Sequence, residues 1–203
     1  MSKKFSRSGI LFVVSAPSGA GKTTLCDALR QTPDFVYSVS CTTREPRAGE
    51  IEGEDYHFIS QKEFLERVAA GEFLEHASVH GKYYGTLREP VVSNLKKGVD
   101  VLIDIDIQGA ASIRQYDDQF VRRSLADVFI MPPDLEELRR RLTKRGTETE
   151  AQIKVRLKTA AREMELWRDY RYTIISRSVE EDLLKFRHIM GAERYLSNRM
   201  ILA

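Results

Sequence analysis

Only two cysteines occur in the 203 residues, Cys26 and Cys41, and they do not form a CxxC pair. This count excludes a disulfide framework and a zinc site built from cysteine pairs. Long apolar runs are missing as well. The run at 10–14 is too short for the apolar segment of a signal peptide, and no segment approaches the roughly 18 consecutive apolar residues of a membrane helix. We therefore expect a cytoplasmic protein.

Excess charge of one sign is also absent. The 32 lysines and arginines nearly balance the 30 aspartates and glutamates, which leaves a net charge of +2. Overall charge therefore gives no reason to expect nucleic acid or an anionic membrane as a partner, and we expect neither. The apolar fraction of 42% and the charged fraction of 31% are ordinary for a globular protein. The length suits one domain over residues 1–203.

Buried strands are predicted where an apolar run shows no polar alternation. Three such runs occur, at 10–15, 99–107 and 126–131. The first leads through a loop of small residues into a helix that begins near Lys22 and ends before Pro33, which is half of a βαβ unit. The later segments predict two helices, a short apolar stretch and a closing helix, at 135–144, about 150–170, 172–176 and about 179–196. The sequence thus predicts an α/β fold with a parallel sheet covered by helices.

The segment from residue 39 to about residue 90 has a different composition, because it is rich in Arg, Glu, Tyr and Gly. It separates the first predicted helix from the second apolar run. We interpret it as a substrate-binding region inserted into the core.

A glycine-rich loop joins the first predicted strand to its helix. The loop differs at one position from the phosphate-binding pattern G-x-x-x-x-G-K-[ST], and it has the strand-loop-helix context that the pattern requires. Gly19 and Gly21 allow backbone N–H groups to wrap a phosphate closely. Lys22 is predicted to bridge the β- and γ-phosphates of ATP, and Thr23 to direct its hydroxyl at Mg²⁺. The predicted ATP-binding residues are Ala16, Pro17, Ser18, Gly19, Ala20, Gly21, Lys22, Thr23 and Thr24.

Ala16 stands where the pattern has glycine, and Pro17 has no N–H to donate. The first position of the pattern mainly leaves the strand, so alanine can serve there wherever φ is negative. A chance glycine-rich turn before a helix is the alternative, and the complete Gly-Lys-Thr-Thr ending argues against it.

Two aspartates end the second apolar run, Asp104 and Asp106. Residues spaced i, i+2 on a strand point to the same face, so both carboxylates are expected to face the phosphate loop. Ligands of open α/β sheets gather at the carboxyl ends of the strands, which is where a carboxylate directed at Mg²⁺ belongs. Asp104 is the predicted metal residue beside Thr23, partly through water. A solvated strand end is the alternative.

Six blocks of the sequence resemble the guanylate kinase family, in matching order and spacing, from the phosphate loop to about Leu157. One such block would say little, but six in register are specific. Besides the phosphate loop and the Asp104-Ile-Asp-Ile-Gln-Gly block, they are Ser40-Cys-Thr-Thr-Arg-Glu-Pro-Arg-Ala-Gly-Glu, Gly53-Glu-Asp-Tyr-His-Phe, Tyr83-Tyr-Gly and Arg145-Gly-Thr-Glu-Thr-Glu.

The resemblance implies an enzyme that transfers the γ-phosphate of ATP to GMP, with Mg²⁺ and without a tightly bound organic cofactor. GMP carries a dianionic phosphate and a guanine edge with an acceptor at O6 and donors at N1 and N2, so its site needs cations and carboxylates. By the resemblance, two arginines and two tyrosines bind the phosphate, two acids accept from the guanine donors, and two hydroxyls lie near O6 and the base edge. In that order, the residues are Arg44, Arg47, Tyr56, Tyr84, Glu75, Asp106, Ser40 and Thr86.

The family has a lid, which corresponds here to about residues 133–156. The implied fold is therefore a P-loop NTPase-type parallel sheet flanked by helices, with the inserted GMP-binding region and this lid. Arg141, Arg145 and Arg156 match arginines that face the transferring phosphate and, with Lys22, are the expected catalytic residues. Their charge neutralises the phosphoryl group while the lid excludes water.

The resemblance weakens after Trp167. Family members often have Val-Asn-Asp near adenine after the last strand, where this chain has Ile-Ser-Arg-Ser at 175–178. Ser176 or Arg177 is the candidate for the same place.

Three other functions are possible. The first is a guanylate kinase-like binding module that has lost phosphoryl transfer, and the complete phosphate loop with its lid arginines argues against it. A GTPase switch would use a guanine-specific N-K-x-D type motif, which the sequence lacks. The last is a P-loop enzyme with a different acceptor, such as AMP or dTMP. Glu75 and Asp106 argue against this last function, because two acids suit the donors of guanine.

Overall fold

The computed structural model describes residues 5–31, 34–79, 81–146 and 149–202. At its centre is a five-stranded parallel sheet with the strand order β10-β9-β2-β8-β3. The strand that precedes the phosphate loop, β2, is therefore in the middle of the sheet. This confirms the predicted α/β fold with a parallel sheet. The strands are β2 (Leu11–Ser15), β3 (Val36–Tyr37), β8 (Val101–Asp104), β9 (Leu125–Met131) and β10 (Tyr172–Ile175).

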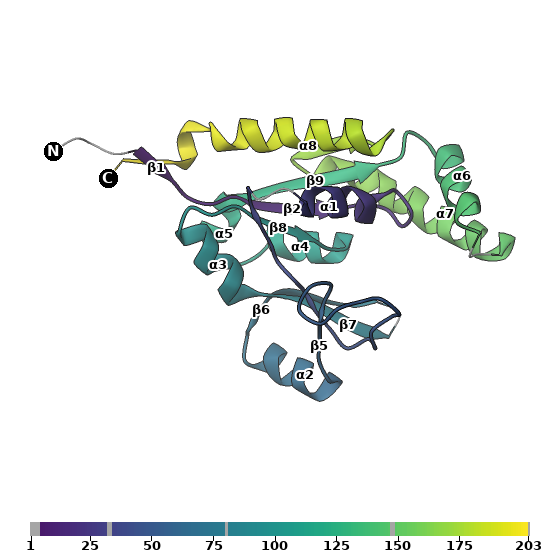
Figure 1. The fold of residues 1–203 in the computed structure, drawn as a ribbon, viewed down its shortest axis with the longest axis horizontal. Coiled ribbons are helices and arrows are strands. Elements are labelled where there is room, and N and C mark those ends of the chain that lie inside the picture. The colour runs from purple at the N-terminus through teal and green to yellow at the C-terminus, as the bar shows by residue number, and fades with distance from the viewer. Residues whose placement is uncertain (1–4, 32–33, 80, 147–148, 203) are drawn as a thin grey trace.

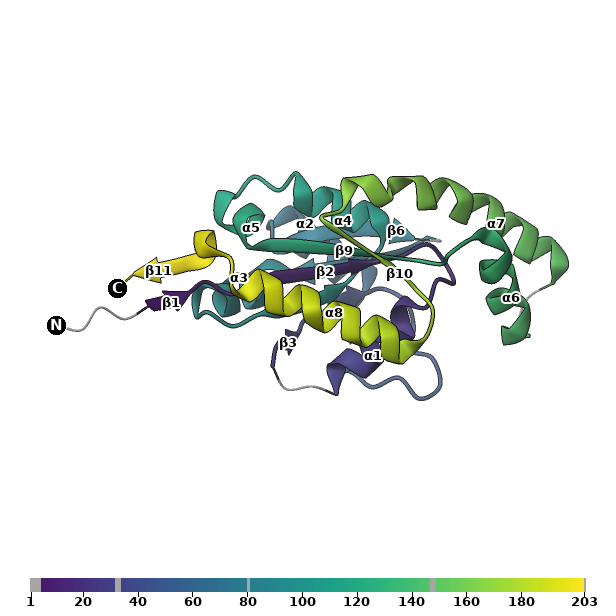
Figure 2. The ribbon, with the colours of Figure 1, turned by 90° about the horizontal axis from the view of Figure 1, so that it is seen from above.

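Helices cover both faces of this sheet, which explains why its strands show no polar alternation (Figure 2). Phe12 and Val14 pack on one face, and Leu11 and Val13 pack on the other. Within the described ranges, no helix combines the length and apolar character that crossing a membrane requires. The face that carries Phe12 and Val14 is covered by α1 (Lys22–Arg30) and α8 (Val179–Arg194). The face that carries Leu11 and Val13 is covered by α3 (Arg88–Lys96), α4 (Ile107–Arg114) and α5 (Gln119–Ser124).

Residues 41–87 build a second sheet of four strands, in the order β5-β4-β7-β6, which lies below the central sheet in Figure 1. Cys41, Phe64 and Phe73 form its small core, where the two phenylalanine rings stack with their centroids 4.5 Å apart. Helix α4 of the larger unit packs against β6. The elements of this inserted sheet are β4 (Cys41–Thr42), β5 (His57–Phe58), α2 (Gln61–Ala69), β6 (Phe73–Val79) and β7 (Lys82–Leu87).

Two helices, α6 (Leu135–Arg145) and α7 (Glu150–Met164), form a hairpin at one end of the molecule (Figure 1). The side chain of Asp134 caps α6, and Gly146 ends it with a left-handed φ of 67°. The helix predicted at about 150–170 is shorter than expected, because α7 gives way to a 3-10 segment, η1 (Glu165–Asp169). The hairpin has its own apolar core of Leu138, Leu142, Ile153 and Ala160.

The strand predicted at 99–107 is also shorter than expected. It ends at Asp104, because the side chain of Asp106 accepts a hydrogen bond from the N–H of Gly109 at 2.7 Å and caps α4. The two aspartates therefore do not lie on one strand, although both line the same cavity.

The two ends of the described chain pair as a short antiparallel ribbon of β1 (Phe5–Arg7) and β11 (Met200–Leu202), which follows a 3-10 segment, η2 (Ser197–Arg199). No sequence pattern indicated this pairing. Beneath it, the Asp100 side chain is only 1% exposed and accepts from Arg7 at 2.5 Å and from Arg194 at 2.7 Å. This carboxylate links β1 and α8 to the start of β8.

Candidate active site

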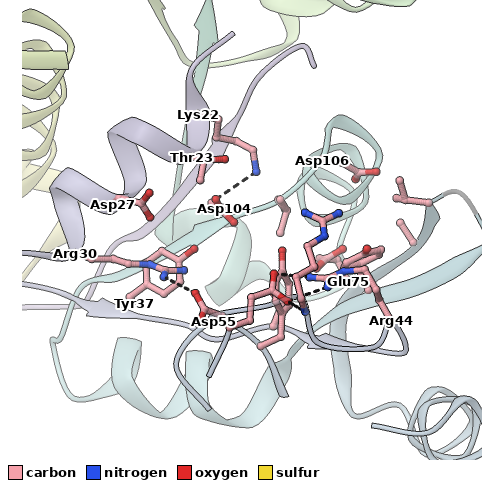
Figure 3. Close-up of a pocket in the computed structure, with 18 residues that line it drawn as sticks. Lys22, Thr23, Asp27, Arg30, Tyr37, Arg44, Asp55, Glu75, Asp104 and Asp106 are labelled. Carbon is pink, nitrogen blue, oxygen red and sulfur yellow. Dashed lines mark hydrogen bonds and ion pairs between the residues drawn. The ribbon is translucent and has the colours of Figure 1, made fainter. Parts of the chain in front are cut away.

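A cavity of about 380 Å³ lies between the carboxyl end of β8, the start of α1 and the inserted sheet. Lys22 and Thr23 lie on one side of it, and Arg44 and Glu75 lie on the other (Figure 3). Seven of the eight residues predicted to bind GMP line this cavity: Ser40, Arg44, Arg47, Tyr56, Glu75, Tyr84 and Asp106.

The phosphate loop passes from β2 into α1 beside this cavity. Gly19 and Gly21 have φ values of 88° and 103°, in the left-handed region that favours glycine. The N–H of Ala20 donates to the carbonyl of Pro17 at 3.1 Å, which closes a turn. Because Gly21 is the N-cap of α1, no side chain occupies the first N–H groups of the helix. Such a loop can present several N–H donors to an anion.

Lys22 and Asp104 meet where the loop approaches β8. The Lys22 Nζ lies 3.4 Å from Oδ2 of Asp104, and Thr23 faces the same cavity. Among the described residues, no group of three or more His, Cys, Asp or Glu side chains could hold a metal ion alone. Mg²⁺ commonly takes one or two protein oxygens together with substrate phosphates and water. The Asp104 carboxylate and the Thr23 hydroxyl are a donor set of that kind.

Arg44 is bound on both terminal nitrogens by Glu50. Each nitrogen donates to the carboxylate at 2.8 Å, and the backbone N–H of Arg47 donates to it at 2.7 Å. The hydrogen bonds from Arg44 lower the pKa of Glu50 to about 2, and Glu50 in turn raises the pKa of Arg44. The rings of Tyr56 and Tyr84 lie edge to face beside them, with centroids 6.0 Å apart. The four predicted phosphate-binding residues are thus together on one wall.

Glu75 is buried, with 6% of its surface exposed. Thr86 donates its hydroxyl to Glu75 at 2.7 Å, and Ser40 lies 3.5 Å from that hydroxyl. Burial raises the pKa of Glu75 to about 7, and the negative charge of Asp106 adds to this increase. The hydrogen bond from Thr86 acts in the opposite direction and lowers the pKa. A Cβ on Gly109 would lie 2.6 Å from Oε2 of Glu75, so glycine allows this close approach of α4. Thr86 therefore lies behind Glu75 and contacts its carboxylate.

Arg141 reaches from α6 to the phosphate loop. Its Nη1 donates to the carbonyl of Ala20 at 2.9 Å and to the Ser176 hydroxyl at 3.0 Å, and its Nη2 donates to the Ser176 carbonyl at 3.1 Å. A second cavity, of about 530 Å³, is lined by Gly19, Gly21, Arg141 and residues 176–178. The segment that departs from the family pattern therefore lies beside the phosphate loop.

The other arginines that the resemblance assigns to a lid lie on α6 and α7. Arg145 is described only as the last residue of α6, since its side chain lies outside the described part of the chain. Arg156 lies on α7 with its side chain partly buried. Arg139 and Arg140 are exposed and form ion pairs with glutamates of the same hairpin.

Several cavity residues were not identified from the sequence. The Arg30 guanidinium lies 3.7 Å from the centroid of the Tyr37 ring and 3.9 Å from a carboxylate oxygen of Asp55. These three residues come from separate segments, and no motif connects them. Glu50 was also missed, although an acid three residues after Arg47 in a matched block was an available signal.

Comparison with known proteins agrees with this geometry. The family model described as guanylate kinase matches residues 8–193. Guanylate kinase from Clostridium tetani is 41% identical over 192 residues, which are 95% of this chain and 90% of that protein. Guanylate kinase from Caldanaerobacter subterraneus is 44% identical over 189 residues, 93% of this chain and 89% of that protein. A crystal structure of guanylate kinase from Anaplasma phagocytophilum matches with a TM-score of 0.80 and 37% identity, covering 98% of this chain and 93% of that one. The chain belongs to the guanylate kinase family.

Proposed function

We propose that this protein is an ATP:GMP phosphotransferase, which converts ATP and GMP to ADP and GDP with Mg²⁺. One observation carries the proposal. A single cavity joins the lysine of a phosphate loop, Lys22, to a wall that bears Arg44 and to the buried acid Glu75. Phosphoryl transfer needs a donor phosphate site beside an acceptor site, and this cavity offers both.

The acceptor side suits a guanine nucleotide with a free phosphate. Arg44 and Arg47 supply guanidinium groups for the phosphate, helped by the hydroxyls of Tyr56 and Tyr84. Burial raises the pKa of Glu75 to about 7. Near neutral pH its carboxylate can therefore be ionised and accept hydrogen bonds from the N1 and N2 donors of guanine. AMP and the pyrimidine nucleotides lack that pair of donors.

The donor side is the phosphate loop. Its N–H groups and Lys22 would bind the β- and γ-phosphates, and Thr23 and Asp104 would hold the metal ion. Mg²⁺, when bound with ATP, neutralises charge on the phosphates. An oxygen of the GMP phosphate attacks the γ-phosphorus as the bond to ADP breaks, and Lys22 stabilises the charge that develops. Arg141 lies at the loop and can add a second positive charge.

The direct test is an ADP-release assay with ATP and Mg²⁺, in which GMP, AMP, CMP, UMP and dTMP are offered separately. We expect turnover with GMP and at most traces with the others. A parallel titration of each nucleotide monophosphate measures binding without turnover. Binding of GMP with no ADP release would make the protein a binding module, and turnover with AMP or dTMP would place it in another class of nucleotide kinase.

A further inference from the structure

The lid hairpin of α6 and α7 contacts the phosphate loop at three successive positions, Ser18, Gly19 and Ala20, none of which lines the cavity of about 380 Å³. The N–H of Ser18 donates to Oε2 of Glu163 on α7 at 3.2 Å. Gly19 faces the apolar core of the hairpin, where a Cβ would lie 2.8 Å from a methyl carbon of Leu142. The carbonyl of Ala20 accepts from Arg141 on α6 at 2.9 Å. The hairpin thus binds one donor and one acceptor of the same loop.

The contacts with Glu163 and Arg141 determine the orientation of two peptide groups of the loop. In each planar peptide the N–H and the C=O point in opposite directions. When the Ser18 N–H points out to Glu163, the Pro17 carbonyl of the same peptide points into the loop, where it accepts from the Ala20 N–H at 3.1 Å. When the Ala20 carbonyl points out to Arg141, the Gly21 N–H of that peptide points inward. The two contacts therefore orient the peptides at both ends of the turn.

Helix energetics do not account for Glu163 at this place. It is the next-to-last residue of α7, where a negative charge opposes the helix dipole. A carboxylate beside a loop that binds triphosphate is also electrostatically unfavourable. What the position offers is a hydrogen-bond acceptor for an N–H that no carbonyl of the turn reaches.

We propose that Glu163 is a positioning residue for the phosphate loop: as an acceptor, it fixes the Ser18 peptide and so presets the turn that receives ATP. The proposal rests on the proposed function, because it assigns ATP to this loop. It makes α7 part of the ATP site without any contact between Glu163 and the nucleotide.

The experiment compares E163A, which removes the acceptor, with E163Q, which keeps an acceptor oxygen and removes the charge. We expect E163A to raise KM for ATP about five-fold, the scale of one exposed hydrogen bond to a charged acceptor, with KM for GMP changed less than about two-fold. E163Q should stay within about two-fold of the wild type for both substrates. The control is E165A, which removes an exposed glutamate, 79% exposed, on the following 3-10 segment.

Calorimetric titration with a non-hydrolysable ATP analogue and Mg²⁺ gives a second readout that needs no turnover. It should show the same order, with weaker binding by E163A alone. The proposal is overturned if E163A binds the analogue like the wild type, if E163Q loses as much affinity as E163A, or if E163A weakens ATP and GMP equally together with a lower melting temperature. Failure of GMP to act as acceptor would refute the proposed function and leave this titration interpretable.

Discussion

The carboxylate of Glu50 accepts from both terminal nitrogens of Arg44, at 2.8 Å each, and so occupies the guanidinium fork that is proposed to meet the GMP phosphate. It also accepts from the N–H of Arg47 at 2.7 Å. An arginine fork paired in this way has few rotamers left, so it is oriented before substrate arrives. The same negative charge lies close to the place of an incoming dianion. Glu50 therefore both orients Arg44 and opposes the phosphate, and mutation can decide which effect is larger.

We predict that the loss of orientation dominates. E50A should raise KM for GMP about ten-fold with a smaller change in kcat, because the two arginine segments lose their common acceptor. E50Q, which keeps one acceptor oxygen, should fall between E50A and the wild type. The measurement is GMP saturation at fixed ATP, with E45A, a change at a nearby exposed acid, as control. A lower KM for GMP in E50A would mean that Glu50 acts mainly as a competitor of the phosphate.

The second prediction concerns pH and Glu75. Because its pKa is raised to about 7, Glu75 is largely protonated below that pH and then cannot accept from both guanine donors. GMP affinity should therefore fall as the pH is lowered from 8 to about 6, while affinity for an ATP analogue changes little. Titrations of both ligands across this range test the prediction. E75Q should bind GMP weakly at every pH, and a pH dependence that survives in E75Q would assign the titration to another group.

The third prediction concerns the effect of Glu75 on stability, which has the opposite sign from that of an acid whose pKa is lowered by an ion pair, such as Glu50. Its pKa in the folded state lies above the value near 4.5 of an exposed glutamate, so the folded protein binds the proton more tightly than the unfolded chain. Ionised Glu75 thus costs stability, and this cost develops as the pH rises from about 4.5 to about 7. E75Q should melt at a higher temperature than the wild type at pH 8, by a few degrees, and the difference should vanish near pH 4. Equal melting temperatures at pH 8 would contradict this account.

The sequence was sufficient for the parts of the site that depend on local spacing. The phosphate loop needs only a strand, two glycines and a Lys-Thr pair in order, and all of these are adjacent in the chain. Lys22 and Asp104 could be brought together because parallel strands end at one edge of a sheet. The inserted region was visible as a change of composition.

Other parts could not be predicted, because they depend on contacts between distant segments. The buried hydrogen bond from Thr86 to Glu75 requires the register of two strands, and the stacking of Arg30 on Tyr37 requires the packing of α1 on the sheet. Arg7 and Asp100 are separated by 93 positions, so no local pattern could pair them. Asp106 was assigned to a strand, because the apolar pattern does not reveal that its carboxylate caps a helix.

The fourth prediction separates chemistry from folding at Lys22. K22A should lower kcat by at least about a thousand-fold, as expected for loss of a cation at the transferring phosphate. The fold should persist, because the Lys22–Asp104 pair is partly exposed and such pairs contribute little stability. The ADP-release assay and thermal melting test both parts. K62A, a change at a lysine side chain that is 87% exposed on α2, is the control. Activity of K22A near that of the wild type would remove Lys22 from the mechanism.

The fifth prediction concerns stability far from the cavity. Asp100, 1% exposed, accepts from Arg7, from Arg194 and from the N–H of Ile10 at 3.0 Å. D100N should destabilise the protein by about 2–4 kcal/mol, since it removes the buried charge that Arg7 and Arg194 share. The partial exposure of both arginines, and the second ion pair of Arg194 with Asp34, reduce the loss. D34N is the matched control, because Asp34 also pairs with Arg194 but is 37% exposed, and it should cost less than about 1 kcal/mol.

Urea unfolding with both variants measures this difference, and steady-state assays should give kinetic constants near those of the wild type for D100N, because Asp100 does not line either cavity. The double variant R7A/D100N measures how much of the stability lost in D100N comes from the contact between Arg7 and Asp100. If the ribbon of β1 and β11 depends on the Arg7–Asp100 pair, adding R7A to D100N should cost much less than R7A alone, since their common contact is already lost. Additive losses would instead assign the effect of D100N to Arg194 and the Ile10 N–H, and would leave the ribbon independent of Asp100.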